Sequence, residues 1–146
     1  MTTTQIGFRV IPDYIPGLPP LHLTVRLDDQ VLLDQPITEP LDVVHEVSDD
    51  EGQHCLEFEM SKKTYAHSPR DSEGNNLGDC FLRIENISFD DIQLTHIFSV
   101  HARYSHSYND PTGTVIEEEC YGVMGCNGHV RFNFETPIYL WLLENM

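Results

Sequence analysis

The sequence predicts an all-β fold, an antiparallel β-sandwich of the jelly-roll type with about eight to ten short strands. Three observations lead to this fold class. Apolar and polar residues alternate with a period of two in several segments, which is typical of strands with one buried and one exposed face. Turn-forming Asp, Asn, Gly and Pro residues separate these segments. No stretch longer than about ten residues has a convincing helical pattern.

The N-terminal residues 1–20 are predicted as a proline-rich arm, and residues 21–146 as a single sandwich domain. Alternation over residues 6–10 indicates a short edge strand. Four prolines and a glycine follow within residues 11–20. Because proline fixes φ and lacks an amide donor, residues 11–20 are expected to form neither a helix nor a central strand. Such an arm can lie on its own domain or reach to a neighbouring molecule.

The first half of the domain contains several expected strands. Residues 21–27 alternate, and the chain returns through residues 31–33 after a short Asp-Asp-Gln turn, so this pair is predicted to form a β-hairpin. Another strand is expected from residue 41. After an acidic turn at residues 48–52, the segment 54–60 alternates again, with one polar and one apolar face.

Residues 71–100 are the stretch around which the chain is organised. An oxygen-rich turn leads there into the longest apolar-alternating segment of the protein. The alternation changes phase at residues 85–86, which indicates either a β-bulge or a turn through residues 90–91. Residues 97–100 are expected to continue as strand.

The C-terminal part combines a polar loop, a strand and a hairpin signal. Residues 104–113 are expected to be a loop because they contain Asn-Asp-Pro and Gly. Residues 115–121 are expected to form a strand. The dipeptide Asn127-Gly128 is the strongest hairpin signal in the chain, with residues 130–134 as the returning strand.

The last ten residues form the densest apolar segment. Pro137 suits the first position of a short helix, but a buried terminal strand fits the composition as well. The apolar side chains need cover, either from the core of the domain itself or from a partner. The candidate partner-binding residues are Tyr139, Trp141, Leu142 and Leu143.

The charge of the chain restricts its partners. Lys plus Arg number 8 against 24 Asp plus Glu in 146 residues, so the formal net charge is −16. Nucleic acids and anionic membranes are bound through cationic side chains, and neither is an expected partner. The negative charge instead favours a basic protein partner or a cation.

Four cysteines and the N-terminal sequence indicate an intracellular origin. No CxxC spacing typical of zinc sites is present, and although an even count permits two disulfides, we expect four thiols in a reducing cytoplasm, at least two of them in the core. The N-terminal residues lack the basic and apolar regions of a secretory signal. No apolar run approaches the roughly 20 residues that span a bilayer.

One loop carries the residue types of a calcium site. Calcium takes roughly six to eight oxygen ligands from carboxylates, amides and carbonyls. The candidate ligands are Asp71, Glu73, Asn75 and Asp79. The loop is not an EF-hand, because Leu82 occupies the twelfth position. The same residue types are also the commonest ones in turns.

Other residue types suggest glycan contact but no catalysis. Tyr104 and Tyr108 lie in the expected polar loop, where aromatic rings can stack on sugars. The histidines, including His101 and His106, lack the converging spacing of a metal site and are expected to face solvent. No Gly-x-Ser-x-Gly motif occurs, and so acidic a chain singles out no carboxylate pair. We therefore expect no enzymatic activity.

Several motifs together resemble those of a known group of proteins. They are the turn from Asp71 to Asp79, the segment Leu82-x-Ile-x-Asn-Ile-x-Phe-Asp-Asp-Ile92, the Asn-Gly pair at residues 127–128, and Pro137-Ile-Tyr-Leu-Trp-Leu-Leu-Glu-Asn-Met146. Over roughly residues 50–146, the chain resembles small β-rich proteins encoded by tailed phages of cyanobacteria. These proteins are generally taken as virion components.

This resemblance implies a non-enzymatic assembly or accessory protein of a virion, synthesised in the host cytoplasm. Its expected partners are other virion subunits and further copies of itself in a homo-oligomer. The N-terminal arm and the apolar C-terminal segment are the expected contact elements. A looser similarity, carried by the loop at residues 71–79 and the strand after it, is to calcium-dependent carbohydrate-binding modules with jelly-roll folds. The alternative function is calcium-dependent binding of a host surface glycan, with calcium as the only expected cofactor.

Overall fold

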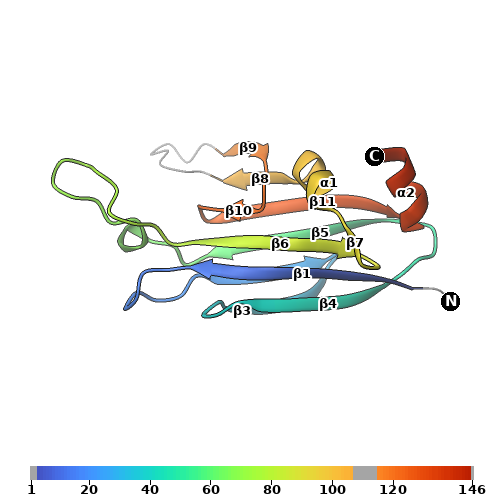
Figure 1. Ribbon diagram of the computed structural model, residues 1–146, viewed down its shortest axis with the longest axis horizontal. Helices are drawn as coiled ribbons and strands as arrows, with labels where there is room; N and C mark the ends of the chain where they lie inside the picture. Colours follow the sequence, from blue (N-terminus) through green and yellow to red (C-terminus); the bar gives the residue numbers. More distant parts are fainter. Residues whose placement is uncertain (1–2, 107–114, 146) are drawn as a thin grey trace.

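The computed structural model describes residues 3–106 and 115–145 and confirms the antiparallel β-sandwich (Figure 1). The described residues form eleven strands, slightly more than expected. The strands are β1 (Thr3–Asp13), β2 (His22–Leu27), β3 (Gln30–Pro36), β4 (Leu41–Ser48), β5 (Gly52–Ser61), β6 (Phe81–Phe89), β7 (Ile92–Gln93), β8 (Arg103–His106), β9 (Ile116–Glu119), β10 (Val123–Met124) and β11 (Gly128–Thr136). The helical elements are a 3-10 turn (Tyr65–His67), α1 (Thr95–His101) and α2 (Ile138–Asn145).

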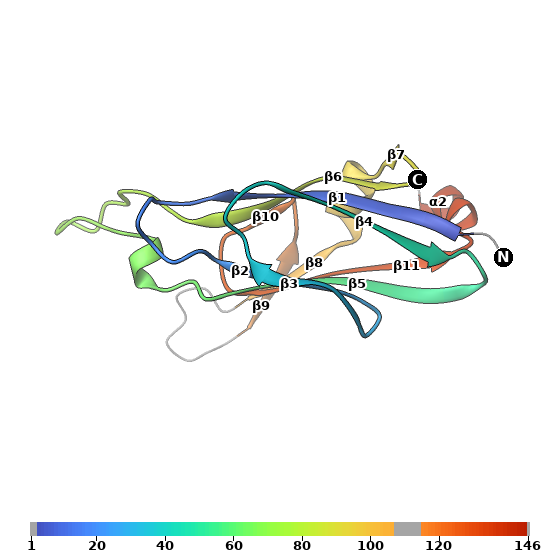
Figure 2. The same cartoon turned by 90° about the horizontal axis from the view of Figure 1, so that it is seen from below.

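Two sheets pack face to face, as Figure 2 shows. Sheet A has the strand order β10-β6-β1-β4 with β7 also paired to β6, and sheet B has the order β3-β2-β5-β11-β8-β9. Aromatic rings from the two sheets meet in the core. The ring centroids of Phe8 in β1 and Phe58 in β5 are 5.0 Å apart, and those of Phe89 in β6 and Phe134 in β11 are 4.8 Å apart.

The alternating segments of the first half form strands of sheet B, as predicted. β2 and β3 are an antiparallel hairpin joined at Asp28 and Asp29, and Asp28 adopts a positive φ of 50° in the turn. In β5 the residues Leu56, Phe58 and Met60 are buried, and the intervening side chains lie on the outer face of the sheet. Period-two alternation identified both elements because each sheet has one face on the core.

Strand β1 corrects the prediction of a short edge strand followed by an arm. It runs from Thr3 to Asp13 and pairs with β4 on one side and β6 on the other, so it lies inside sheet A. Pairing with β4 ends at Val10, and Pro12 therefore lies beyond the part of β1 that is paired on both sides. Residues 14–20 connect β1 to β2 and pack Ile15 against the core of this same chain.

The phase change in the long alternating segment is a bulge, and the turn after it is also present. Asn86 in β6 has a φ of 56°, and the register between β6 and β1 shifts between Gly7 and Arg9. Asp90 and Asp91, both with positive φ, join β6 to β7 in a tight hairpin. Both alternatives predicted for this region are therefore present.

Residues 97–100 lie in helix α1, and the prediction of a continuing strand was wrong. Leu94, Ile97 and Phe98 are buried together, with the three- and four-residue spacing of one helical face. The amide of Phe98 donates to the carbonyl of Leu94 at 2.7 Å, which closes the first helical turn. The helix packs this face into the sandwich core.

The Asn127-Gly128 pair does not form a hairpin, contrary to the prediction. The strand before it, β10, pairs with β6 in sheet A, whereas the strand after it, β11, belongs to sheet B. The Asn127 side chain instead binds the backbone of Lys63. Its Oδ1 accepts from the Lys63 amide at 3.0 Å, and its Nδ2 donates to the Lys63 carbonyl at 2.9 Å.

Candidate functional site

Four segments that are distant in sequence meet at one end of the sandwich, which we call the α2 end. They are residues 3–6, 47–54, 89–93 and 134–145. Here β1 pairs with β4 and β6, and β5 pairs with β11, so backbone hydrogen bonds hold the segments together. Figure 1 shows α2, β7 and the start of β1 at this end, opposite the long loop that precedes β6.

Helix α2 begins directly after Pro137, as the helical alternative predicted. One of its faces closes the core, with Ile138, Trp141 and Leu142 all buried. The Trp141 ring makes edge contacts with Phe132 and Phe134 of β11, at centroid distances of 5.6 and 6.4 Å. This face fixes the helix to the sandwich.

Two aspartates from neighbouring turns also hold α2 in place. Asp49, after β4, accepts hydrogen bonds from the backbone amide of Ile138 and the hydroxyl of Thr4, each at 3.0 Å. Asp90, after β6, lies 3.4 Å from the hydroxyl of Tyr139, and its negative charge raises the pKa of that hydroxyl. The position of the helix is therefore set at its start and along one side.

The other face of α2 is apolar and exposed. Tyr139, Leu140 and Leu143 keep 51%, 59% and 75% of their surface accessible. We call these three residues the α2 patch. The first six residues of α2 are all apolar or aromatic, and the polar residues Glu144 and Asn145 follow at its end. An apolar helical surface of this kind is normally buried.

The structure divides the four residues predicted to bind a partner into two groups. Trp141, only 7% exposed, and Leu142 belong to the core of the chain itself, so they are not available on the surface. Tyr139 and Leu143 are exposed. Leu140 was missed, although helical spacing places it with Leu143 on the same side.

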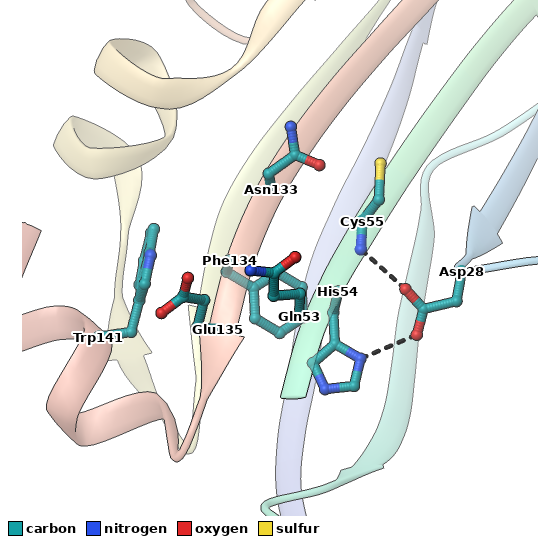
Figure 3. A pocket seen from close by; sticks show the side chains of 8 residues that line it. All are labelled: Asp28, Gln53, His54, Cys55, Asn133, Phe134, Glu135 and Trp141. Carbon is teal, nitrogen blue, oxygen red and sulfur yellow. Dashed lines mark hydrogen bonds and ion pairs between the residues drawn. The ribbon is translucent and has the colours of Figure 1, made fainter. Parts of the chain in front are cut away.

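A shallow depression of about 450 Å³ lies beside the α2 end, with residues from β5, β11, α2 and the β2–β3 turn (Figure 3). Its lining consists of Asp28, Gln53, His54, Cys55, Asn133, Phe134, Glu135 and Trp141. The His54 ring stacks on Phe134 with centroids 5.3 Å apart. Burial raises the pKa of the Cys55 thiol, which disfavours the nucleophilic thiolate.

His54 links three chain segments at the edge of this depression. Its Nδ1 lies 2.8 Å from the carboxylate of Asp28, whose other oxygen accepts from the Cys55 amide at 2.8 Å. Its Nε2 lies 3.0 Å from the hydroxyl of Thr136. Because residues 28, 54 and 136 are so far apart in sequence, local motifs do not reveal this network.

The order Asp28, His54, Thr136 resembles a catalytic triad, but its geometry does not suit one. A nucleophilic hydroxyl needs to pass its proton to the histidine and to reach a substrate. The Thr136 side chain is buried, and its hydroxyl donates to the Asp50 carbonyl at 2.5 Å. The three residues instead tie the β2–β3 turn, β5 and the end of β11 together.

The predicted calcium ligands are divided between two sets of contacts. The Asp71 carboxylate accepts hydrogen bonds from the amides of Asn75 and Glu73, both at 2.9 Å, and these bonds lower its pKa. Asp79 binds the ammonium of Lys63 at 2.7 Å. In residues 3–106 and 115–145, no group of three or more His, Cys, Asp or Glu side chains is arranged to hold a metal. The calcium site stays a prediction.

Tyr104 lies in strand β8 and not in the polar loop expected there. It is 4% exposed, and its hydroxyl donates to the carbonyl of Cys126 and accepts from the Cys126 amide at 2.8 Å. Burial raises the pKa of this hydroxyl. Its ring therefore has no free face for a sugar, which corrects the predicted role. Tyr108, the second candidate glycan contact, lies outside the described residues.

His106 and two of the four cysteines are buried in the sandwich. His106 is buried in β8, where its Nε2 lies 2.7 Å from Glu118 of β9, so the expectation that it faces solvent was wrong. All four cysteines are free thiols, and Cys80 and Cys120 are buried. Burial raises the pKa of the Cys120 thiol.

Most of the lysine and arginine side chains that form ion pairs lie on the outer faces of the two sheets. On sheet B, Glu57 accepts from Arg26 at 2.9 Å and from Arg131 at 2.8 Å. Burial opposes the charged form of Glu57, but Arg131 and the other neighbouring cations keep its pKa below the ordinary value. On sheet A, Arg83 binds Asp13 at 2.7 Å.

Comparisons with protein-family models, curated proteins and solved structures give no match for this chain. Among the described residues, no helix has both the length and the apolar character to cross a membrane. The similarity to phage proteins and to carbohydrate-binding modules stays a hypothesis carried by sequence motifs.

Proposed function

We propose that this protein is a non-enzymatic binding module that makes protein contacts through the α2 patch. One observation supports this: the first six residues of α2 are apolar or aromatic, but only the face with Ile138, Trp141 and Leu142 meets the core. Covering a large apolar side chain contributes roughly 1.5–3 kcal/mol. A partner surface would supply the cover that the sandwich does not.

The α2 patch also has the rigidity of a docking element. Trp141 and Leu142 are packed in the core, and Asp49 binds the first turn of the helix. A surface that is already ordered loses little conformational entropy on binding, which favours affinity. Aromatic and leucine side chains on such a scaffold suit the centre of a protein interface.

The virion-assembly role implied by the sequence resemblance is one setting for such a module. Other virion subunits would then be the partners. Calcium-dependent glycan binding has no specific contact in its favour, because Tyr104 is buried and Asp79 is paired with Lys63. The contacts at the α2 end therefore favour protein binding over glycan binding.

A random-peptide display library tests this proposal. Peptides are selected on the wild-type protein and then compared on the double variant Leu140→Ser/Leu143→Ser. We expect the selected peptides to lose at least about tenfold in affinity, which corresponds to about 1.4 kcal/mol. Both leucines are exposed, so the variant should keep the fold, and its thermal unfolding is measured in parallel.

The matched control replaces exposed apolar residues elsewhere. Val31→Ser/Val44→Ser removes two valines that are 53% and 61% exposed on strands β3 and β4. Selected peptides should bind this control like the wild type. Peptides that bind all three proteins equally would contradict the proposal, as would a failure to select any peptide.

A further inference from the structure

The charge around the α2 patch restricts its partner. The four segments of the α2 end hold seven acidic residues and no lysine or arginine: Asp49, Asp50, Glu51, Asp90, Asp91, Glu135 and Glu144. Asp90 lies 3.4 Å from the hydroxyl of Tyr139 in the α2 patch, Asp49 accepts from the Ile138 amide at 3.0 Å, and Glu144 belongs to α2 itself. The field at this end is therefore negative.

Among residues 3–106 and 115–145, these seven carboxylates form no ion pair. In the described part of the chain, five of the eight Lys and Arg side chains form ion pairs, namely Arg9, Arg26, Lys63, Arg83 and Arg131. Each of these pairs lies on a sheet face or in the loop before β6.

A second copy of this chain is a poor occupant for the patch. A two-fold dimer through α2 would bring the same surface from both subunits together. The acidic groups of both copies would then meet around the apolar contact, and like charges across an interface cost several kcal/mol. A suitable partner would instead cover the exposed leucines with apolar side chains and place cations next to the carboxylates.

We propose that the α2 patch binds a cationic amphipathic helix of a partner protein. The apolar side chains of that helix would cover Tyr139, Leu140 and Leu143, and its lysines and arginines would face the carboxylates of the α2 end. This assignment rests on the proposed function and adds the chemistry of the partner. Paired helices bury about one face each, which matches the single exposed face of α2.

The same charge opposes the other macromolecules that an apolar helix face can meet. Anionic lipid surfaces attract basic segments and repel acidic ones. Nucleic acids require phosphate neutralisation by cationic side chains. A zwitterionic bilayer lacks these repulsions, so binding to it is included as an outcome of the test.

The test uses two helical peptides with the same leucine face. One carries lysines on its polar face and the other carries glutamates. Binding to the full chain is measured by fluorescence anisotropy at low and at high salt. We expect the lysine peptide to bind, the glutamate peptide to bind at least about tenfold more weakly, and added salt to reduce the difference.

Three variants locate the binding on the protein. The apolar variant is Leu140→Ser/Leu143→Ser, and the charge variant is Glu51→Gln/Asp91→Asn/Glu144→Gln at the α2 end. The matched control removes the same charge elsewhere with Glu39→Gln/Glu73→Gln/Glu117→Gln, all exposed residues. We expect an affinity loss of about tenfold in each of the first two variants and no loss in the control.

Each further outcome decides the proposal. Equal losses in the charge variant and its control would indicate attraction to the whole acidic protein and would overturn it. So would failure of the lysine peptide to bind, or stronger binding to phosphatidylcholine vesicles that depends on the leucines. If the two peptides bind equally and both lose affinity in the apolar variant, the protein-binding function stands, and the cationic partner is wrong.

Discussion

Acidic residues such as Glu57 on the outer face of sheet B have arginine partners, whereas those at the α2 end have none in the described part of the chain. On the sheet face, Glu57 lies between Arg26 and Arg131 at hydrogen-bond distance from both. At the α2 end, Glu51 and Glu144 are exposed, and no lysine or arginine occurs in the segments around them. The acidic excess of the chain is therefore unevenly distributed.

The difference separates charge that supports the fold from charge that is open to a partner. An ion pair on a sheet face contributes to cross-strand pairing and leaves little field outside the molecule. At the α2 end, Asp49 and Asp90 hydrogen-bond to α2, but exposed carboxylates such as Glu51 and Glu144 have no ion pair in the described part of the chain and repel one another. Such carboxylates beside an exposed apolar face are typical of a surface whose complement lies on another molecule.

The largest expected effect is a difference in stability between substitutions on the two faces of helix α2. Trp141→Ala should reduce the free energy of unfolding by about 3–5 kcal/mol, because the ring fills the core against Phe132 and Phe134. Leu143→Ala, at a site that is 75% exposed, should change it by less than about 0.5 kcal/mol. Urea unfolding measures both values. Similar losses in the two variants would show that the assigned faces are wrong.

A smaller effect compares the two acidic environments. Glu57→Gln should destabilise the protein by about 1 kcal/mol, because it weakens charge-assisted hydrogen bonds to Arg26 and Arg131. Glu51→Gln should cost nothing measurable, since this side chain has no ion pair in the described part of the chain. Chemical denaturation of both variants checks the contrast, which would break down if Glu51→Gln cost as much.

The effect of Glu57 should depend on pH in a defined direction. Its folded-state pKa lies below the ordinary value of 4.5, despite the opposing effect of burial, because Arg131, His129 and Arg26 favour the carboxylate. The contribution of Glu57 to stability is therefore complete at pH values above the ordinary pKa. It is lost as the pH falls through the lower pKa of the folded state. The stability difference between the wild type and Glu57→Gln should shrink as the pH falls from about 7 to about 3. A difference that grew on acidification would contradict this.

A still smaller effect concerns the charge at the α2 end. Glu51→Gln/Asp91→Asn/Glu144→Gln should leave stability unchanged or raise it by up to about 0.5 kcal/mol, because like charges are removed. The gain should vanish in about 1 M salt, where the Debye length is about 3 Å. Thermal unfolding at two salt concentrations measures it. A clear loss of stability would show that these carboxylates support the fold.

The smallest expected effect is that of calcium on thermal unfolding, which tests the acidic loop around Asp71. In this loop Asp79 forms an ion pair, whereas the carboxylates of the α2 end form none among the described residues. We expect excess calcium, relative to chelator, to shift the unfolding midpoint by less than about 1 °C, because Asp71 and Asp79 already have partners within the chain. Specific binding at about 100 times the dissociation constant would add roughly 2.7 kcal/mol and several degrees. A calcium shift that disappears in Asp71→Ala would restore the glycan-binding alternative.

Local patterns predicted most strands and missed the elements that depend on distant partners. The alternation of Leu56, Phe58 and Met60 predicted β5, because a strand with one buried face shows it in neighbouring residues. Pro12 argued against a central strand, yet β1 lies inside sheet A, since β4 pairing ends before the proline. Asn127 and its glycine signalled a hairpin, but the flanking strands join different sheets.

The candidate site was predicted only in part. The apolar composition of the C-terminal segment indicated that Tyr139 and Leu143 need cover, and the helical period would have added Leu140 to them. The composition could not show that Trp141, unlike these residues, is buried in the core. The acidic residues of the α2 end were not recognised as a group, because they come from turns that are distant in sequence.

By itself the sequence determined the β-rich class, the charge excess and the apolar nature of the C-terminal segment, because these depend on composition and on spacing between neighbours. Only the tertiary structure decided that the C-terminal segment is a helix, which face of it meets the core, which acids have arginine partners and which acids lie together at the α2 end. Those outcomes depend on contacts between strands that are distant in the chain, and short-range periodicity carries no information about them.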